Sequence, residues 1–259
     1  FNDQRVFCNY GVILKNLGKL QEAEISYRKA IELNPNNVEA HSNLGNILKD
    51  LGNLQEAELS LRKAIQLNPD FTNANYNLGI ILRDLGNLQE AELSLRKVIQ
   101  LNPDFADAHF NLAFIELLRG NYKSGLENYE FRLKTKINKP AIPHGNTKIK
   151  KLDQEKLKKG EKLLILSEQG LGDTLQYMRY VPYLENEGYD ISFCAQNKLH
   201  SLIKASGINH NPLTPDQANT ILEGKWISLL SLPKYLNINP SNPIISEPYI
   251  FSTVELRKK

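Results

Sequence analysis

The chain has 259 residues, of which 24% are charged, and its formal net charge is +3. This length is generous for one domain and comfortable for two. The small net charge provides no basic surface of the kind that binds nucleic acid, so we expect no nucleic-acid partner. No apolar run approaches the roughly 20 residues that a membrane span needs, and no signal peptide is readable, so we expect no membrane span. Because the chain begins at Phe1, inside a helical pattern, we expect it to be a fragment.

The cysteines and histidines predict no metal site. Cys8 and Cys194 lie in different halves of the chain, and neither they nor the five histidines show the spacing of metal ligands. Two such distant cysteines also exclude a disulfide framework. Their pattern favours a reducing, cytoplasmic location.

A repeat of 34 residues dominates positions 1–135. It aligns three columns: Gly11, Gly45, Gly79 and Ala113; Ala23, Ala57, Ala91 and Gly125; Pro35, Pro69 and Pro103. This period is typical of stacked helix pairs, and the small residues allow two helices to cross closely. We therefore predict an α-solenoid of about four repeats. The fourth repeat departs from the pattern, since Glu116, Gly125 and Arg132 replace small or apolar residues.

The stretch NLGNILKDLGNLQEAELSLRKAIQLNPD resembles the tetratricopeptide (TPR) family, in the form found in the superhelix of O-GlcNAc transferases. The resemblance covers about residues 4–135. It implies a right-handed superhelix whose concave groove holds an extended segment of another polypeptide, and a protein-binding function.

One column of the repeat does not serve packing. It consists of Asn9, Asn43, Asn77 and Asn111, and we call it the asparagine column. The resemblance places it, together with Asn46, on the wall of the groove. Asparagine costs roughly half a kcal/mol against alanine inside a helix, so some interaction should offset it. A primary amide can pair with both the N–H and the C=O of a ligand backbone, which predicts weak, sequence-tolerant peptide binding.

The sequence offers two alternatives to peptide binding by this column. Tandem duplication could have copied a solvated asparagine, although the divergent first and fourth repeats also retain it. A clamp for a C-terminal carboxylate would need lysine directly before each asparagine. The residues there are Cys8, Ser42, Tyr76 and Phe110, which argues against a clamp.

The second half of the chain follows a lysine-rich segment, residues 136–160, that is predicted to be a linker. From residue 161 to residue 259 the pattern alternates between short apolar runs and helical segments. Strands are expected at 163–166, 191–194 and 226–230, with a helix at 198–206. This order predicts a Rossmann-like α/β domain with three layers.

A glycine-containing loop follows the first of these strands. It comprises Glu168, Gln169, Gly170, Gly172, Asp173 and Thr174, at the strand end where open α/β sheets bind ligands. The loop lacks the third glycine of a dinucleotide-binding motif and the Gly-Lys-Ser/Thr of a P-loop. Asp173 with Gln176 could equally form an N-terminal helix cap.

The segments LLILSEQGLGDTLQYMRYVPYLENEG and LLSLPKYL are similar to the N-terminal half of heptosyltransferase-like GT-B glycosyltransferases, as in bacterial proteins where TPR repeats precede that domain. The resemblance implies that Asp173 is the candidate base that activates the acceptor hydroxyl. Glu168 and Gln169 could line the same crevice. It also implies a nucleotide-sugar donor for a complete enzyme, with no cofactor in this chain.

These observations favour a piece of a protein glycosyltransferase that acts on a polypeptide held by the TPR groove. A GT-B enzyme needs a second domain for most donor contacts, and only about 100 residues follow the linker here. We therefore expect this chain alone to be inactive. The alternative is a non-catalytic TPR scaffold whose α/β half serves as a docking surface.

Overall fold

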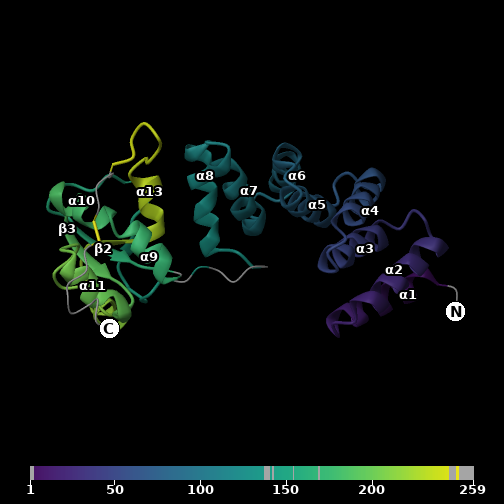
Figure 1. The fold of residues 1–259 in the computed structure, drawn as a ribbon, viewed down its shortest axis with the longest axis horizontal. Coiled ribbons are helices and arrows are strands. Elements are labelled where there is room, and N and C mark those ends of the chain that lie inside the picture. The colour runs from purple at the N-terminus through teal and green to yellow at the C-terminus, as the bar shows by residue number, and fades with distance from the viewer. Residues whose placement is uncertain are drawn as a thin grey trace. The chain divides into compact units, whose positions relative to one another are not determined.

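A computed structural model describes residues 3–136, 141, 143–153, 155–168, 170–244 and 249–250 of the chain. The chain divides into two compact units, Phe1–Asn121 and Tyr122–Lys259. The first consists of helices, and the second contains a parallel sheet with helices around it (Figure 1).

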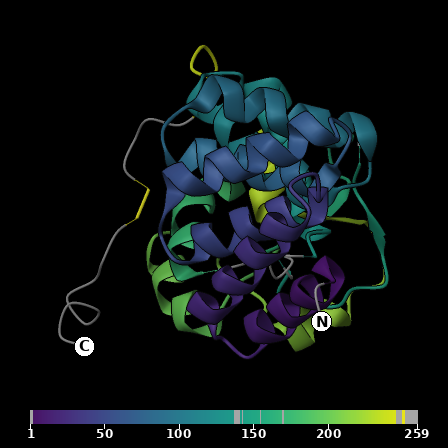
Figure 2. The same cartoon turned by 90° about the vertical axis from the view of Figure 1, so that its right-hand side faces the viewer.

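The first unit is a row of antiparallel helix pairs in which each helix packs against the next (Figures 1 and 2). The first helices of the pairs are α1 (Gln4–Asn16), α3 (Val38–Asp50), α5 (Thr72–Asp84) and α7 (Ala106–Leu118). The second helices are α2 (Leu20–Leu33), α4 (Leu54–Leu67) and α6 (Leu88–Leu101). The first helices of consecutive pairs also contact one another.

Two glycines of the second repeat show why the 34-residue pattern specifies these pairs. Gly52 ends the first helix with φ at +84°, a left-handed conformation that favours glycine. Gly45 lies where the helices cross, and a Cβ added there would be 2.6 Å from Cγ of Leu61 and 3.1 Å from the carbonyl oxygen of Ala57. The predicted close crossing is therefore confirmed.

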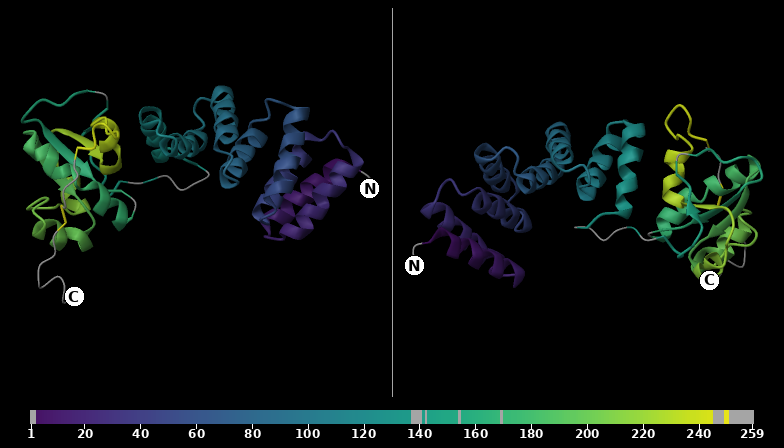
Figure 3. Two further views of the ribbon diagram at one scale, coloured as in Figure 1. Left: turned by 45° about the horizontal axis from the view of Figure 1, so that its top comes forward. Right: turned by 180° about the vertical axis from the view of Figure 1, so that it is seen from behind.

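The second unit begins with α8 (Tyr122–Tyr129) and the short 3-10 helix η1 (Glu130–Leu133). Helix α8 packs against α13 (Leu232–Tyr235), which lies near the end of the described chain (Figure 3). The fourth helix pair of the repeat region is thus divided, because α7 belongs to the first unit and α8 to the second.

Over the described residues the sheet has four strands, all parallel, in the order β1-β4-β2-β3. The strands are β1 (Lys150–Lys151), β2 (Lys162–Leu166), β3 (Asp190–Cys194) and β4 (Lys225–Ser228). Helices α9 (Leu171–Tyr177) and α10 (Tyr180–Asn186) connect β2 to β3. The connection from β3 to β4 holds η2 (Asn197–Leu199), α11 (His200–Ala205) and α12 (Pro215–Asn219), and η3 (Leu229–Ser231) follows β4.

Both faces of the sheet are buried. On β2, Leu163 and Ile165 pack into one apolar cluster, and Leu164 and Leu166 pack into another. This explains why β2 is an uninterrupted apolar run rather than an alternating one. The predicted fold class, a solenoid of helix pairs followed by a layered α/β domain, is confirmed. The third predicted strand, 226–230, ends earlier, at Ser228, because the chain turns there into η3.

Part of the segment predicted as a linker belongs to the second unit. Lys150 and Lys151 form β1 at the sheet edge, and Leu152 and Leu157 are buried in the core of the unit. The main-chain N–H of His144 also donates to the carbonyl oxygen of Ser167 at 2.7 Å. The lysine-rich composition of this segment favoured a linker, but the burial of Leu152 and Leu157 attaches the segment to the second unit.

Candidate functional site

The asparagine column occupies one equivalent position in the four first helices. Asn9, Asn43, Asn77 and Asn111 are each the sixth residue of their helix. Since these helices contact one another in sequence, the four side chains follow one another along the row. The structure therefore places all four predicted residues in one series, but their surroundings differ.

The first three members of the column carry amides without an internal partner. Asn9 is exposed, whereas Asn43 and Asn77 are half-buried. Within the described part of the chain, none of these three side chains forms a hydrogen bond. A half-buried amide has lost part of its hydration. If it has gained no hydrogen-bond partner within the protein, it can form hydrogen bonds with a ligand.

Asn111 is held by its neighbours. Its Nδ2 donates to Oη of Tyr76 at 3.2 Å and to the carbonyl oxygen of Asp107 at 2.8 Å, and its Oδ1 accepts from Nη1 of Arg83 at 2.5 Å. Burial raises the pKa of Tyr76 to about 12, so its hydroxyl stays protonated. Both N–H groups and the oxygen of the Asn111 amide are thus engaged, and the side chain is buried.

A second column of the repeat, His41, Asn75 and His109, has a structural role. Asn75 lies on α5, two residues before Asn77. Nδ2 of Asn75 donates to the carbonyl oxygens of Pro69 at 3.0 Å and Phe71 at 3.1 Å. One repeat away on each side, Nε2 of His41 and of His109 lie 2.9 Å from the carbonyl oxygens of Pro35 and Pro103. This column holds the loop between helix pairs and is not available to a ligand.

Asn46 lies three residues after Asn43, so the two side chains share one face of α3. It is half-buried and has no hydrogen-bond partner among the described residues. The equivalent positions of the other repeats are Val12, Ile80 and Phe114. Asn46 is therefore a feature of the second repeat alone.

The second unit contains a topological switch point. The chain leaves β2 for β3 on one side and then passes to β4 on the other side of β2. Ligands of open α/β sheets bind at the carboxyl ends of strands where such a reversal occurs. Here Glu168 follows β2, and Ser228 ends β4.

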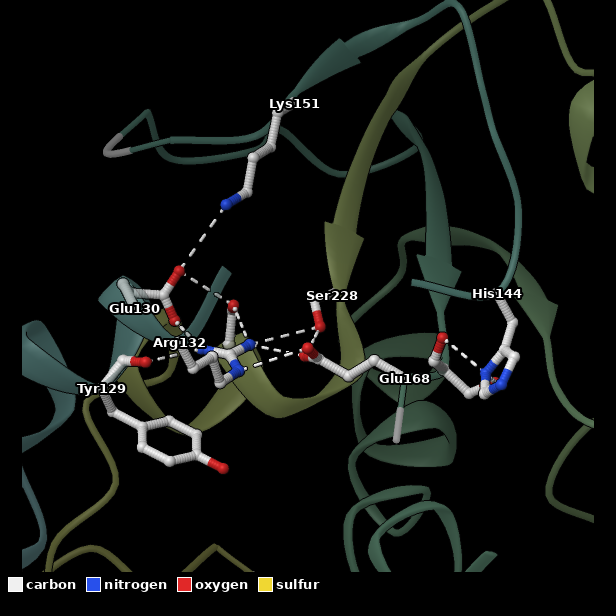
Figure 4. Close-up of polar contacts among 9 residues, drawn as sticks. Tyr129, Glu130, Arg132, His144, Lys151, Glu168 and Ser228 are labelled. Atoms are coloured by element: carbon white, nitrogen blue, oxygen red, sulfur yellow. Dashed lines mark hydrogen bonds and ion pairs between the residues drawn. The ribbon is translucent and has the colours of Figure 1, made fainter. Parts of the chain in front are cut away.

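A side chain from outside the sheet fills this position. Arg132, on η1, places Nη2 2.5 Å from Oε1 of Glu168 and Nε 3.2 Å from Oε2, so the pair is bidentate (Figure 4). The guanidinium also donates to Oε1 of Glu130 at 2.9 Å and to Oγ of Ser231 at 3.0 Å. Ser228 donates its hydroxyl to Glu168, and Ser231 donates to Glu130 at 2.9 Å.

The two carboxylates around this guanidinium have different electrostatic surroundings. Burial raises the pKa of Glu168 above its usual range despite the opposing effect of Arg132. Burial also acts to raise the pKa of Glu130, but Arg132, the Ser231 hydroxyl and Lys151 outweigh it and hold that pKa below its usual range. Because Glu168 is fully buried and paired, it does not present a free carboxylate to a ligand.

Sequence reasoning placed Glu168 in a crevice but did not identify its partner. Arg132 lies in the repeat column of Ala30, Ala64 and Val98, so its departure from the small or apolar pattern was the available signal. This departure marked Arg132 as unusual, but it did not predict the ion pair with Glu168.

The rest of the predicted loop is more open. The main-chain N–H of Gly170 donates to Oδ2 of Asp173 at 3.3 Å. Gly170 is thus the N-cap of α9 and Asp173 lies in its first turn, so the predicted cap with Asp173 at the N-cap and Gln176 as its partner is wrong. The Thr174 side chain is buried and donates to Oε1 of Gln196 at 2.8 Å. A Cβ added at Gly172 would meet no described atom within 4 Å. Gln169 lies outside the described residues.

The described residues contain no group of three or more His, Cys, Asp and Glu side chains that could hold a metal ion. Among the same residues, no helix combines the length and the apolar character needed to cross a membrane.

Comparisons with known proteins identify the repeats. A TPR repeat model matches residues 11–52, and a tetratricopeptide repeat model matches residues 38–71 and 72–105. Together with the helix pairs, these matches show TPR repeats in the N-terminal half of the chain. Residues 106–259 lie outside them. No curated protein matches the chain.

Several solved structures resemble part of this chain. The crystal structure of MamA shares 23% identity over 51% of this chain and 78% of its own, with a TM-score of 0.49. MamA 41-end from Desulfovibrio magneticus RS-1 shares 25% over 50% of this chain and 73% of its own, with a TM-score of 0.47. The first TPR of Spaghetti (RPAP3), bound to an HSP90 peptide, shares 26% over 45% of this chain and 93% of its own, with a TM-score of 0.45.

Proposed function

We propose that the TPR repeats bind an extended segment of another polypeptide through the amides of Asn9, Asn43 and Asn77. One observation carries this proposal: the same helical position repeats an asparagine whose amide has no partner among the described residues in three consecutive repeats. The main-chain N–H and C=O of a guest peptide are the groups that such amides complement. Asn46 would add a fourth amide beside Asn43.

The spacing of the helices predicts the length of the guest. Packed helices lie about 8–10 Å apart, and an extended chain advances about 3.3 Å per residue. One asparagine therefore meets about every third residue of the peptide. Three asparagines engage roughly six or seven residues, and since each hydrogen bond contributes only about 0.5–1.5 kcal/mol, binding should be weak and length-dependent.

The test is the binding of fluorescein-labelled random-sequence peptide pools of increasing length, measured by anisotropy. Lengthening the peptides from about four to about ten residues should strengthen binding until the three asparagines are occupied. The double variant Asn43→Ala/Asn77→Ala should weaken binding of the longest pool by about ten- to a hundredfold, since each 1.4 kcal/mol is a factor of about ten. Its helical circular dichroism should not change.

Asn36→Ala is the matched control, because Asn36 is an exposed residue of the loop between α2 and α3. It should bind the peptide pools as the unmodified chain does. Equal affinities for the double variant and this control would exclude the proposed role of the column.

We further propose that the α/β unit is the acceptor-side half of a glycosyltransferase that modifies the bound polypeptide. The supporting observation is the place of Asp173: this residue is half-buried in the first turn of α9, which follows the central strand β2, and there is open space beside Gly172. A carboxylate there has the chemistry of a general base for an acceptor hydroxyl. Its contact with Gly170 is compatible with that task.

In a complete enzyme, Asp173→Asn should abolish transfer and leave peptide affinity unchanged. A nucleotide-sugar donor should bind the complete enzyme and not this chain. Full transfer activity of the variant would exclude Asp173 as the base. An absence of transfer in every longer form of the protein would favour the alternative, a TPR scaffold without catalysis.

A further inference from the structure

The second unit contains a cavity that neither proposal uses. Its volume is about 840 Å³, within the range of small-molecule sites. It is bounded by β1, β4 and the segment that includes η3 and α13. The charged residues of its wall are Glu130, Lys150, Lys151, Asp153, Lys156 and Lys234. We call it the lysine-rimmed cavity.

The charge of the wall is positive. Four lysines face two carboxylates, Glu130 and Asp153, which leaves an excess of two positive charges. Glu130 is also already engaged by Arg132 and Ser231. The wall therefore has more positive charge than its own acids neutralise.

The lysines differ in how firmly they are held. Nζ of Lys150 is 2.9 Å from Glu155. Nζ of Lys151 lies 3.7 Å from Oε2 of Glu130 (Figure 4). Lys156 and the half-buried Lys234 form no ion pair with any described carboxylate. These last two ammonium groups can pair with a ligand.

The floor of the cavity is apolar and aromatic. Leu152, Leu157 and Ile227 are buried there. The main-chain N–H of Leu157 donates to the Tyr235 hydroxyl at 3.1 Å, which fixes that ring, and Tyr189 adds a second half-buried ring. An inorganic anion would leave this surface unused, whereas a ligand with an apolar or aromatic body would cover it.

We propose that the lysine-rimmed cavity binds an organic phosphate, in which a phosphate group pairs with Lys156 and Lys234 and an apolar or aromatic body packs on the leucine and tyrosine floor. A phosphate monoester carries about −1.5 to −2 charge near neutral pH, which matches the excess of the wall. Lysine is suited to this pairing as a mobile point charge. The body could be that of a nucleoside or a prenyl chain, which share this phosphate chemistry.

Isothermal titration calorimetry of the chain with four probes tests the proposal: adenosine monophosphate, geranyl monophosphate, inorganic phosphate and adenosine. At least one of the two organic phosphates should bind at least tenfold more tightly than inorganic phosphate and adenosine. Preference for adenosine monophosphate would identify a nucleoside ligand, and preference for geranyl monophosphate a prenyl ligand. The affinity should fall as the salt concentration rises.

The variant Lys156→Gln/Lys234→Gln should lose at least tenfold in affinity for the preferred probe. Lys198→Gln, at an exposed lysine outside the cavity, is the control and should bind normally. Trp226 fluorescence would show that both variants are folded. The proposal is overturned if neither organic phosphate binds, if inorganic phosphate or adenosine binds equally well, or if the two variants behave alike.

Discussion

Arg132 and Glu168 are 36 residues apart in the sequence and form a buried bidentate ion pair, with Nη2 of Arg132 2.5 Å from Oε1 of Glu168. Arg132 is 1% exposed and Glu168 is fully buried. The pair joins η1, at the start of the second unit, to the end of the central strand β2. Neither charge is solvated, so each depends on the other for its stability.

Removing the guanidinium should destabilise the second unit strongly. Arg132→Met leaves Glu168 buried without its cation, and breaking a buried pair in this way typically costs about 3–5 kcal/mol. Urea unfolding followed by tryptophan fluorescence measures the effect in this unit, because Trp226 is the only tryptophan of the chain and lies in β4.

Replacing both charged residues separates the cost of a buried unpaired charge from the cost of altered side-chain packing. Arg132→Met/Glu168→Leu should be less destabilised than Arg132→Met, because no unpaired charge remains buried. A loss of under about 1 kcal/mol in the single variant would show that water reaches Glu168 and that the pair is not structural.

The two carboxylates on Arg132 should respond to acid in opposite directions. The pKa of Glu130 is lowered by folding, so the stability that its ionisation contributes is present above the ordinary glutamate pKa of about 4.3 and is lost as the pH falls through the folded pKa. The advantage of the unmodified chain over Glu130→Gln should therefore shrink on acidification. Urea midpoints measured at several pH values check this.

For Glu168 the sign is reversed. Its pKa is raised by folding, so the folded state holds the proton more tightly than the unfolded state between the ordinary pKa and the folded one. The advantage of the unmodified chain over Glu168→Gln should grow as the pH falls through that window. If the stability difference from the unmodified chain changed with pH in the same direction for both variants, Glu130 and Glu168 would not have the different electrostatic surroundings described above.

In the first unit, Gly45→Ala should destabilise the helix pairs. The added Cβ would be 2.6 Å from Cγ of Leu61, and overpacking of this kind costs about 1–3 kcal/mol. The neighbouring Asn46→Ala is the control, since the Asn46 amide has no partner in the part of the chain that the structure describes and alanine is the better helix former. Thermal unfolding by circular dichroism should show a lower midpoint for the first variant and no loss for the second. Equal midpoints would mean that Leu61 moves aside freely.

Local patterns in the sequence were sufficient to predict the helix pairs and three of the four strands, β2, β3 and β4. Each of these depends on residues that are close in the chain or repeat at a fixed spacing. The partner of Glu168 could not be predicted in this way, because Arg132 reaches it only through the tertiary fold. The burial of Leu152 and Leu157 was likewise concealed by the lysines around them.

The asparagine column shows a second limit of prediction from the sequence. Asn77 and Asn111 occupy the same repeat position, but the residues at the corresponding positions of the preceding first helix differ. Asn111 meets Tyr76 and Arg83, whereas the residues at the equivalent positions before Asn77 are Ser42 and Lys49. The amide is engaged where these positions hold Tyr and Arg, and it has no described partner where they hold Ser and Lys.

The most direct test of peptide binding observes the side-chain amides themselves. In a nitrogen-15 NMR titration with the random peptide pool of about ten residues, the NH2 signals of Asn43 and Asn77 should shift as the peptide saturates. Those of Asn75 and Asn111 should stay in place, because their N–H groups already donate within the protein. Peptide binding that leaves the Asn43 and Asn77 amide signals unmoved would contradict the account.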